Sequence, residues 1–494
     1  MRTLRNVGRG RAPTDRARNR QLRPWQGVCT LARRMRKLLF LFTPVTLAFF
    51  TLMACESDSP GGGPTPSLDS GLPDAPPSTD GGQQADATPD AAPSVSVTVT
   101  GGAGPKAGVR VVFHDANGAV METKLTGNDG KATHTGATPS MVSALVVNGR
   151  DHQIVTWTGV ELGDDLQLGA TGSEESLGMY SVTFSGQPDG ASIIDVEGPC
   201  GSNFSYGTAT ELPMYGYCSR AQNAVLATAR TYSGKILGHA FKKGNAAISD
   251  GGTGSIVVGD WTEPSSLALS VDNVPVDTSY NADLLEVADG AGFRNTRAEW
   301  GDFSVTYPTA TGFAEAYQAS VMFGGSGAER AITKRMAPGP KVSFDYDDLL
   351  PRIEDATVVT TDPRRPVASW TTSASTAGTD GGLVRLSFSG PDDSGTYAWT
   401  FVVPPGATTV TAPAMPVEAE SFLPPAVDSG VEASFGVPKV LLLEADVLSG
   451  YAAFRRQQGA LLGSDLMFGF GAISLPVLPT NGTYRTTSWA VVPR

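Results

Sequence analysis

Residues 94–135 read SVSVTVTGGAGPKAGVRVVFHDANGAVMETKLTGNDGKATHT, and their pattern is that of paired β-strands. Valine alternates with serine and threonine over residues 94–100, and apolar residues alternate again over residues 109–113. A period of two places successive side chains on opposite faces of a half-buried strand. The Asn-Gly pair at 117–118 and the GNDG run at 127–130 supply tight turns between strands. This stretch therefore predicts a small antiparallel β-structure.

The same signals continue to the end of the chain. The sequence holds 58 Gly and 35 Pro and few long amphipathic patterns, which favours β-structure over helices. Further strand candidates are residues 141–147, 179–184, 192–196, 225–232, 235–241, 254–259, 267–271, 282–287, 301–307, 317–323, 341–344, 383–388, 396–403, 431–435, 437–448 and 486–492. We therefore predict an all-β fold of tandem β-sandwiches. Its blocks are residues 94–171, 172–265, 266–355 and 356–494.

The first block resembles the carboxypeptidase regulatory-like and bacterial Ig-like modules. The residues that carry the resemblance are Gly108-Val109-x-Val111, Asp115-x-x-Gly118 and Thr126-x-x-Asp129-Gly130-x-Ala132. The resemblance covers residues 95–170. It implies a small β-sandwich without catalysis of its own.

The last block, residues 356–494, resembles two kinds of sandwich. Asp393-Ser394-Gly395-Thr396-Tyr397 resembles the tyrosine corner of immunoglobulin domains, although Trp399 stands where those domains have a cysteine. Strand candidates that end in proline resemble the edges of fibronectin type III domains, because proline blocks further pairing. These ends lie at residues 403–405, 414–416 and 475–479. The resemblance implies a fibronectin-type-III-like domain.

Residues 35–55, MRKLLFLFTPVTLAFFTLMAC, join a short basic segment to an apolar run. The run ends in Leu52-Met53-Ala54-Cys55, which resembles the lipobox of bacterial lipoproteins. The resemblance implies that residues 35–54 are a signal peptide and that Cys55 becomes the lipidated first residue. The alternative is a retained membrane anchor, but the apolar stretch is at the lower limit for spanning a bilayer and Pro44 interrupts it.

Residues 1–34 are rich in arginine and precede the signal peptide. We interpret them as an extension that is either not translated, with the true start at Met35, or disordered. Arg33-Arg34 also suggests a twin-arginine signal, which the following residues fit poorly. The full chain has a net charge of −12, and removal of residues 1–54 leaves 25 basic and 48 acidic residues, or −23. Such a chain repels nucleic acid and anionic membrane surfaces, so we expect no nucleic-acid partner.

Residues 55–93 have the composition of a disordered tether. After Cys55 the segment contains no aromatic and no basic residue, and it has too few apolar residues to offset chain entropy. A flexible coil of this length spans on the order of 35 Å. Its seven acidic residues lack the spacing of a calcium-binding EF-hand loop. We expect the tether to hold the folded part away from the lipid.

Cys200 and Cys218 are the remaining cysteines once residues 1–55 are set aside. An even pair in an exported chain predicts one disulfide, in the block 172–265; two free thiols are the alternative. The enclosed loop holds aromatic residues, Phe204, Tyr206, Tyr215 and Tyr217. These side chains either form a ligand-contact surface or cover the edge of the sandwich.

No linear motif of a known catalytic class occurs in the sequence. The histidines are scattered, at His114, His134, His152 and His239. His114 beside Asp115 is either an acid–base pair or the flank of a hairpin turn, and Asp115 and Asp129 are a possible calcium pair. The acidic run at 345–348 is either a cation site or a solvated loop. We expect no metal and no cofactor.

The sequence as a whole predicts a non-enzymatic lipoprotein of the cell envelope, attached to the membrane through Cys55, with the outer membrane favoured over the inner. Its tandem sandwiches would bind a protein or carbohydrate ligand or act as a scaffold. The alternative is a hydrolase of carbohydrate or peptide with accessory sandwiches, because a pair of catalytic carboxylates can be assembled by folding without a linear motif.

Overall fold

The computed structural model describes residues 93–490 except for internal gaps. These gaps are residues 102–103, 149, 170–175, 200, 216–223, 244–253, 277, 279, 295–298, 301–303, 326, 391–394, 427–432 and 463–476. All described residues belong to the unit Asp86–Arg494. The extension 1–34, the signal peptide 35–54, Cys55 and the tether up to residue 92 lie outside the described range.

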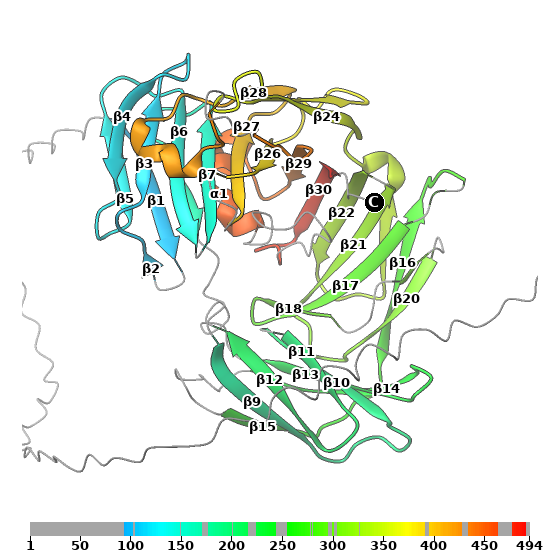
Figure 1. The fold of residues 1–494 in the computed structure, drawn as a ribbon. Helices are drawn as coiled ribbons and strands as arrows, with labels where there is room; N and C mark the ends of the chain where they lie inside the picture. The colour runs from blue at the N-terminus through cyan, green and yellow to red at the C-terminus, as the bar shows by residue number, and fades with distance from the viewer. Residues whose placement is uncertain are drawn as a thin grey trace, which may run out of the picture. The chain divides into compact units, whose positions relative to one another are not determined.

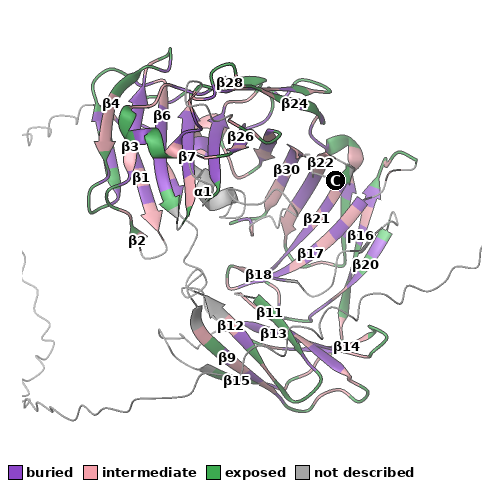
Figure 2. Cartoon of the chain, in the orientation of Figure 1, coloured by how far each residue is buried: buried purple, intermediate pink, exposed green. Residues whose placement is uncertain are grey.

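The described residues form four β-modules, as the ribbon in Figure 1 shows. We call them module 1 (residues 94–169), module 2 (176–258), module 3 (265–345) and module 4 (353–489). The predicted all-β fold of tandem sandwiches is confirmed. Figure 2 shows buried and exposed residues alternating along many strands, as the period of two in the sequence predicts.

Module 1 is a sandwich of two sheets. Its strands are β1 (Ser94–Gly101), β2 (Gly104–Pro105), β3 (Arg110–His114), β4 (Val120–Leu125), β5 (Lys131–Thr135), β6 (Met141–Asn148), β7 (Asp151–Thr158) and β8 (Asp165–Gly169). One sheet has β1 between antiparallel β5 and parallel β8, with β2 paired to β1. The other has the order β4-β3-β6-β7. The two predicted turns lie on either side of β4. At the second one Gly130 has φ of +74°, and a Cβ at this position would lie only 2.4 Å from the Val99 carbonyl oxygen, so glycine is required.

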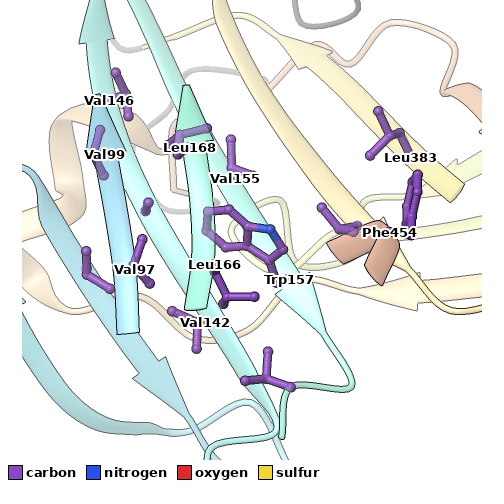
Figure 3. Packing of buried hydrophobic residues seen from close by; sticks show 14 of the residues in the cluster. Val97, Val99, Val142, Val146, Val155, Trp157, Leu166, Leu168, Leu383 and Phe454 are labelled. Carbon is purple, nitrogen blue, oxygen red and sulfur yellow. The ribbon is translucent and has the colours of Figure 1, made fainter. Parts of the chain in front are cut away.

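The interior of module 1 is filled by the alternating apolar side chains that the sequence displays. Val95, Val97 and Val99 of β1 face Trp157 of β7, and all four side chains are fully buried. Figure 3 shows the Trp157 indole between the two sheets, with Leu166 close to it. Burying an aromatic side chain of this size removes a large apolar area from water, so Trp157 is a main source of stability in this core.

Module 2 repeats the arrangement of module 1. Its strands are β9 (Ser176–Phe184), β10 (Ile193–Gly198), β11 (Gly201–Ser205), β12 (Ala209–Tyr215), β13 (Val225–Arg230), β14 (Ile236–Lys242) and β15 (Gly254–Val258). β9 lies between antiparallel β12 and parallel β15, and the facing sheet has the order β11-β10-β13-β14. Tyr180, Val182 and Phe184 of β9 pack in the core between the two sheets.

Module 3 has the same plan again. Its strands are β16 (Ser265–Asp272), β17 (Tyr280–Ala288), β18 (Ala291–Arg294), β19 (Glu299–Trp300), β20 (Ser304–Thr309), β21 (Ala316–Gly325), β22 (Ala328–Met336) and β23 (Lys341–Asp345). β16 lies between antiparallel β20 and parallel β23, and the facing sheet has the order β18-β17-β21-β22. The topology is therefore shared by three successive modules, although the sequence shows no clean repeat period.

Module 4 shares the four-strand sheet of the other modules but differs in the facing sheet. Its strands are β24 (Ile353–Val359), β25 (Val367–Thr372), β26 (Gly381–Phe388), β27 (Tyr397–Val403), β28 (Thr409–Thr411), β29 (Lys439–Ala445) and β30 (Gly482–Trp489). The order β27-β26-β29-β30 matches β4-β3-β6-β7, whereas β24 pairs antiparallel to β25 where the other modules have a parallel last strand. The expected strand at residues 431–435 is not formed as such: 431–432 lie outside the described residues, and Phe435 makes an isolated bridge to Phe388.

Modules 1, 3 and 4 are joined edge to edge. β27 pairs in parallel with β7, and β30 pairs antiparallel with β22. Among the described residues this creates a 13-stranded sheet that runs from β18 in module 3 to β4 in module 1. Of the predicted block boundaries, the one at 171 falls between β8 and β9, whereas those at 265 and 355 fall at the first residue of β16 and inside β24. The structure adds that one sheet passes through three of the four blocks.

The helix α1 (Tyr451–Leu462), which the sequence analysis did not predict, packs against β8 and β26. The guanidinium of Arg455 donates to the Gly159 carbonyl oxygen at 2.6 Å and lies 2.7 Å from a carboxylate oxygen of Asp164. Both charged side chains are almost fully buried. This buried ion pair fixes the position of α1 against module 1, because removing either partner would leave an uncompensated buried charge. Two 3-10 turns complete the described elements, η2 (Tyr346–Asp348) and η3 (Val417–Phe422). No described helix combines the length and the apolar character needed to span a membrane.

Candidate binding surface

The sheet β11-β10-β13-β14 of module 2 exposes a group of aromatic side chains on its outer face. Phe204, Tyr206 and Tyr232 are 53, 67 and 75 % exposed. In Figure 2 most of β11 is correspondingly drawn as exposed. Isolated exposed apolar residues are ordinary, but a chain of three exposed aromatic rings, with Tyr206 in contact with both others, is typical of a recognition surface. We call these three residues, together with Asp195 and Arg230, the aromatic surface.

The backbone register brings the residues of the aromatic surface together. Phe204 of β11 is directly opposite Asp195 of β10, so both side chains lie on the same face of the sheet. Arg230 is the last residue of β13 and pairs with Ile193 of β10. Ile193 is two residues before Asp195, so both lie on the same face of the sheet. Tyr206 follows directly after β11, and Tyr232 lies two residues beyond the end of β13.

The rings contact one another in defined geometries. The ring centroids of Tyr206 and Tyr232 are 6.4 Å apart with an interplanar angle of 26°, a stacked pair. Phe204 meets Tyr206 edge to face, with centroids 5.5 Å apart and an angle of 83°. These contacts orient the rings before any ligand is present, which lowers the entropy cost of binding.

Asp195 and Arg230 form an ion pair beside the rings. The Arg230 Nη2 donates to one carboxylate oxygen of Asp195 at 3.0 Å, and its Nε donates to the other. The hydrogen bond that Arg230 donates to Asp195 is the main cause that raises the pKa of Arg230, and the Tyr206 phenol contributes electrostatically. Both side chains remain partly exposed, at 28 and 38 %. The pair is therefore fixed in position and still accessible to a ligand.

The opposite end of the same outer face is covered. Leu226 and Phe241 pack with Phe293 and Phe313 of module 3. Between the two ends, Thr228 lies opposite Asp195. The Thr228 hydroxyl and His239 Nδ1 form a hydrogen bond 3.1 Å long. Burial lowers the pKa of His239 to about 4. The aromatic surface is thus the open continuation of a face that is otherwise buried.

The predicted lipidation and disulfide sites cannot be placed in the structure. Cys55, Cys200 and Cys218 all lie outside the described residues, and so does Tyr217. In the chain Cys200 stands between β10 and β11, next to the aromatic surface in sequence. The lipid attachment and the Cys200–Cys218 bond stay predictions. Of the loop aromatics singled out from the sequence, Phe204 and Tyr206 are exposed and contribute to the surface.

His114 is part of a buried polar chain and not of an accessible acid–base pair. Its Nε2 lies 3.0 Å from the Ser143 hydroxyl, which lies 2.8 Å from the Thr156 hydroxyl. The Trp399 indole N–H donates to that same Thr156 oxygen at 2.8 Å. His114 and Ser143 are fully buried, so no substrate reaches them. Burial lowers the pKa of His114 to about 4 despite the nearby Asp115 carboxylate, which raises it.

Asp115 and Asp129 do not form a shared calcium site. The carboxylate of Asp115 accepts the backbone N–H groups of Asn117 and Ala119, and the carboxylate of Asp129 accepts that of Lys131. Each therefore closes its own turn. The two turns lie at opposite ends of β4, a strand about 20 Å long.

The other polar residues singled out from the sequence have structural roles. Asp345 accepts the backbone N–H of Asp347 at 2.9 Å, a hydrogen bond that lowers its pKa, and so begins η2 as a capped, solvated turn. His134 Nδ1 lies 2.6 Å from Glu122, and His152 stacks on Tyr397 at 4.8 Å. In the part of the chain that the structure describes, no three His, Cys, Asp or Glu side chains converge in a way that could hold a metal ion.

Comparisons with known proteins give no assignment. No protein family matches the sequence, and no curated protein matches it either. Among solved structures, the Bacillus anthracis TIE protein aligns over 51 % of this chain and 50 % of its own, at 9 % identity and a TM-score of 0.14. The native conformation of E. coli alpha-2-macroglobulin aligns over 68 % of this chain and 26 % of its own, at 11 % identity and a TM-score of 0.10. This chain thus spans half or less of either protein's length.

Sequence reasoning found Phe204 and Tyr206 but missed their partners. The sequence predicts a strand over Val225–Tyr232, which includes Tyr232, whereas β13 ends at Arg230. The signal was present in Ser233-Gly234, because Gly234 takes φ of +88° in the turn that follows. Nothing in the sequence separates Asp195 and Arg230 from other charged residues, since their pairing depends on the register of β10 and β13.

Proposed function

We propose that the chain is a lipid-anchored protein of the bacterial cell envelope that binds a ligand through its β-sandwich modules. The observation that carries the binding part is the aromatic surface, with three exposed rings beside an accessible ion pair. Aromatic side chains that remain exposed and already ordered give large contact area at little entropy cost. The anchoring part rests on the Leu52-Met53-Ala54-Cys55 junction.

The shared sheet supports a role in which modules 1, 3 and 4 keep a fixed arrangement. Modules 1, 3 and 4 are joined through β7–β27 and β22–β30, which restricts bending between them far more than a flexible linker does. Residues 56–93 have the composition of a spacer, and a spacer of that length suits a protein that reaches from the membrane surface to a ligand.

Two measurements test this function. The first is membrane fractionation of the full chain and of Cys55→Ala. We expect the native chain in the membrane fraction and the variant in the soluble fraction or unprocessed. Unchanged membrane retention of Cys55→Ala would contradict lipid anchoring.

The second measurement is binding of the purified mature chain to isolated envelopes of the bacterium that makes it. We expect binding that falls at least about tenfold in the double variant Tyr206→Ala/Tyr232→Ala, because removing two contact rings costs one to several kcal/mol. Val257→Ala is the matched control, since Val257 is 61 % exposed on β15 in the other sheet of the same module. No binding by the native chain would contradict the binding function.

A further inference from the structure

We propose that the ligand of the aromatic surface is a neutral polysaccharide, held by stacking on the rings and by hydrogen bonds to the Asp195–Arg230 pair. This inference rests on the proposed binding function and specifies the chemical class of its ligand.

The rings provide the first part of the argument. Tyr206 and Tyr232 expose 67 and 75 % of their surface, so each ring keeps area open to a ligand although the two stack on each other. The face of an aromatic ring carries partial negative charge and attracts positively polarised C–H groups. A sugar ring offers a face of such C–H groups, whereas its hydroxyls point to the rim. Each exposed tyrosine ring therefore offers a stacking site for a sugar unit.

The ion pair provides the second part. Arginine has five N–H donors, of which two bind Asp195, and a carboxylate has further lone pairs beyond those that Arg230 occupies. The pair thus offers donors and acceptors side by side. Sugar hydroxyls both donate and accept, so they satisfy both members. A proline-rich peptide, which aromatic surfaces also bind, offers mainly carbonyl acceptors and would leave the carboxylate without donors.

Charge decides between neutral and anionic polysaccharides. Asp195 and Arg230 neutralise each other, and the rings carry no charge, so the surface lacks the excess of cations that a polyanion requires. The mature chain, residues 55–494, has 25 basic and 48 acidic residues, or a net charge of −23, which adds repulsion against polyanions. A neutral polysaccharide needs no excess of cations at the surface and is not repelled by the negative charge of the protein.

The test asks whether polysaccharide or protein in the envelope is responsible for binding. Envelopes are treated either with periodate, which cleaves vicinal diols of sugars, or with protease, and are then offered to the native chain. We expect binding to be lost after periodate and retained after protease. Direct titration with neutral glycans (laminarin, dextran and hydroxyethylcellulose) against heparin should give affinity for at least one neutral glycan and none for heparin.

The variants link this binding to the named residues. We expect about a threefold to tenfold loss of affinity for each of Tyr206→Ala and Tyr232→Ala, and a loss for Arg230→Lys, which keeps the charge but not the forked geometry. Val257→Ala should bind as the native chain does. Arg230→Lys keeps the test valid if a tyrosine variant proves unstable.

The outcomes separate the two proposals. Envelope binding that survives periodate and is lost after protease overturns the polysaccharide while leaving the binding function intact. Binding by heparin or by a proline-rich peptide in place of neutral glycans overturns it as well. No envelope binding and no glycan binding by the native chain overturns both proposals.

Discussion

The outer face of the sheet β4-β3-β6-β7 in module 1 and that of β11-β10-β13-β14 in module 2 are equivalent in topology but differ at one end, which is buried in module 1 and open in module 2. In module 1, Val112, Leu145 and Ile154 of this face are buried in one cluster with Trp399 of module 4. In module 2, Phe204 occupies the corresponding face and is 53 % exposed. The same framework therefore carries an interface between modules in one case and an open surface in the other.

The difference follows from how the sheet edges are used. β7, at the edge of its module, pairs with β27, so the outer face of module 1 continues into the core of module 4. β14 is the edge of a sheet that is not part of the 13-stranded one. Exposed strand edges and apolar faces favour association. In module 1 pairing satisfies the edge and joins the apolar face to the core of module 4, whereas in module 2 one end of the face, around Phe204, stays open and its recognition residues remain accessible.

The largest expected effect is that of Trp399→Ala, which removes the side chain that joins the module 1 face to the core of module 4. Trp399 is fully buried and donates its indole N–H to Thr156. We expect a loss of about 5 kcal/mol in the free energy of unfolding, from the cavity and the lost hydrogen bond together. Hydrogen exchange should show reduced protection in β6, β7, β26 and β27. Equal loss of protection in β9–β15 would break the comparison, because it would mean that module 2 depends on the same interface.

Acid should weaken both faces through their buried histidines. Burial lowers the pKa of His114 in module 1 and of His239 in module 2 to about 4, against 6.5 when unfolded. Above pH 6.5 both states are neutral and there is no effect; between pH 6.5 and 4 the unfolded chain binds protons that the folded chain does not. Stability should therefore fall as pH falls, by about 2 kcal/mol for each histidine at pH 4.5.

This pH dependence can be assigned to each module by substitution. Denaturant unfolding at pH 7.5 and 4.5 is compared for the native chain, His114→Gln and His239→Gln. The free energy of unfolding of the native chain should differ between the two pH values, and each variant should show a difference smaller by the contribution of its own histidine. A difference that neither variant reduces would show that these histidines are not the cause.

A smaller effect is expected from Thr156→Val at the polar chain of the covered face. The substitution leaves the Trp399 indole N–H and the Ser143 hydroxyl without their common partner in a buried site. Unsatisfied buried groups of this kind cost about 1–2 kcal/mol. Thr158→Val, at a partly exposed position of the same strand, is the control and should cost less. Thermal unfolding followed by circular dichroism measures both, and equal effects would deny the polar chain a special role.

The smallest effect on stability is expected at the open face. Tyr206→Ala and Tyr232→Ala remove side chains that are mostly exposed, so the free energy of unfolding should change by less than about 0.5 kcal/mol. Denaturant titration of each variant beside Trp399→Ala measures the contrast directly. A loss of several kcal/mol at either tyrosine would mean that the rings cover the sandwich, the alternative reading of the aromatic loop.

The sequence alone determined the all-β class, most strands and the tight turns. The alternation at Val95, Val97 and Val99 predicts a half-buried strand because a period of two is a property of the local backbone. Gly118 and Gly130 predict turns because few other residues adopt their positive φ. Phe204 and Tyr206 were visible as candidate contact residues from composition alone.

Tertiary structure alone decided how the modules join and which face stays open. Nothing local in β7 or β30 specifies pairing with β27 or β22, since the same alternating pattern suits any neighbouring edge. The helix α1 was hidden for a related reason: its position depends on Arg455 reaching Asp164, almost 300 residues earlier in the chain. The aromatic surface likewise depends on the register that sets Asp195 opposite Phe204 and near Arg230. Such contacts arise from non-local packing, for which the sequence carries a pattern of compatible faces but no choice of partner.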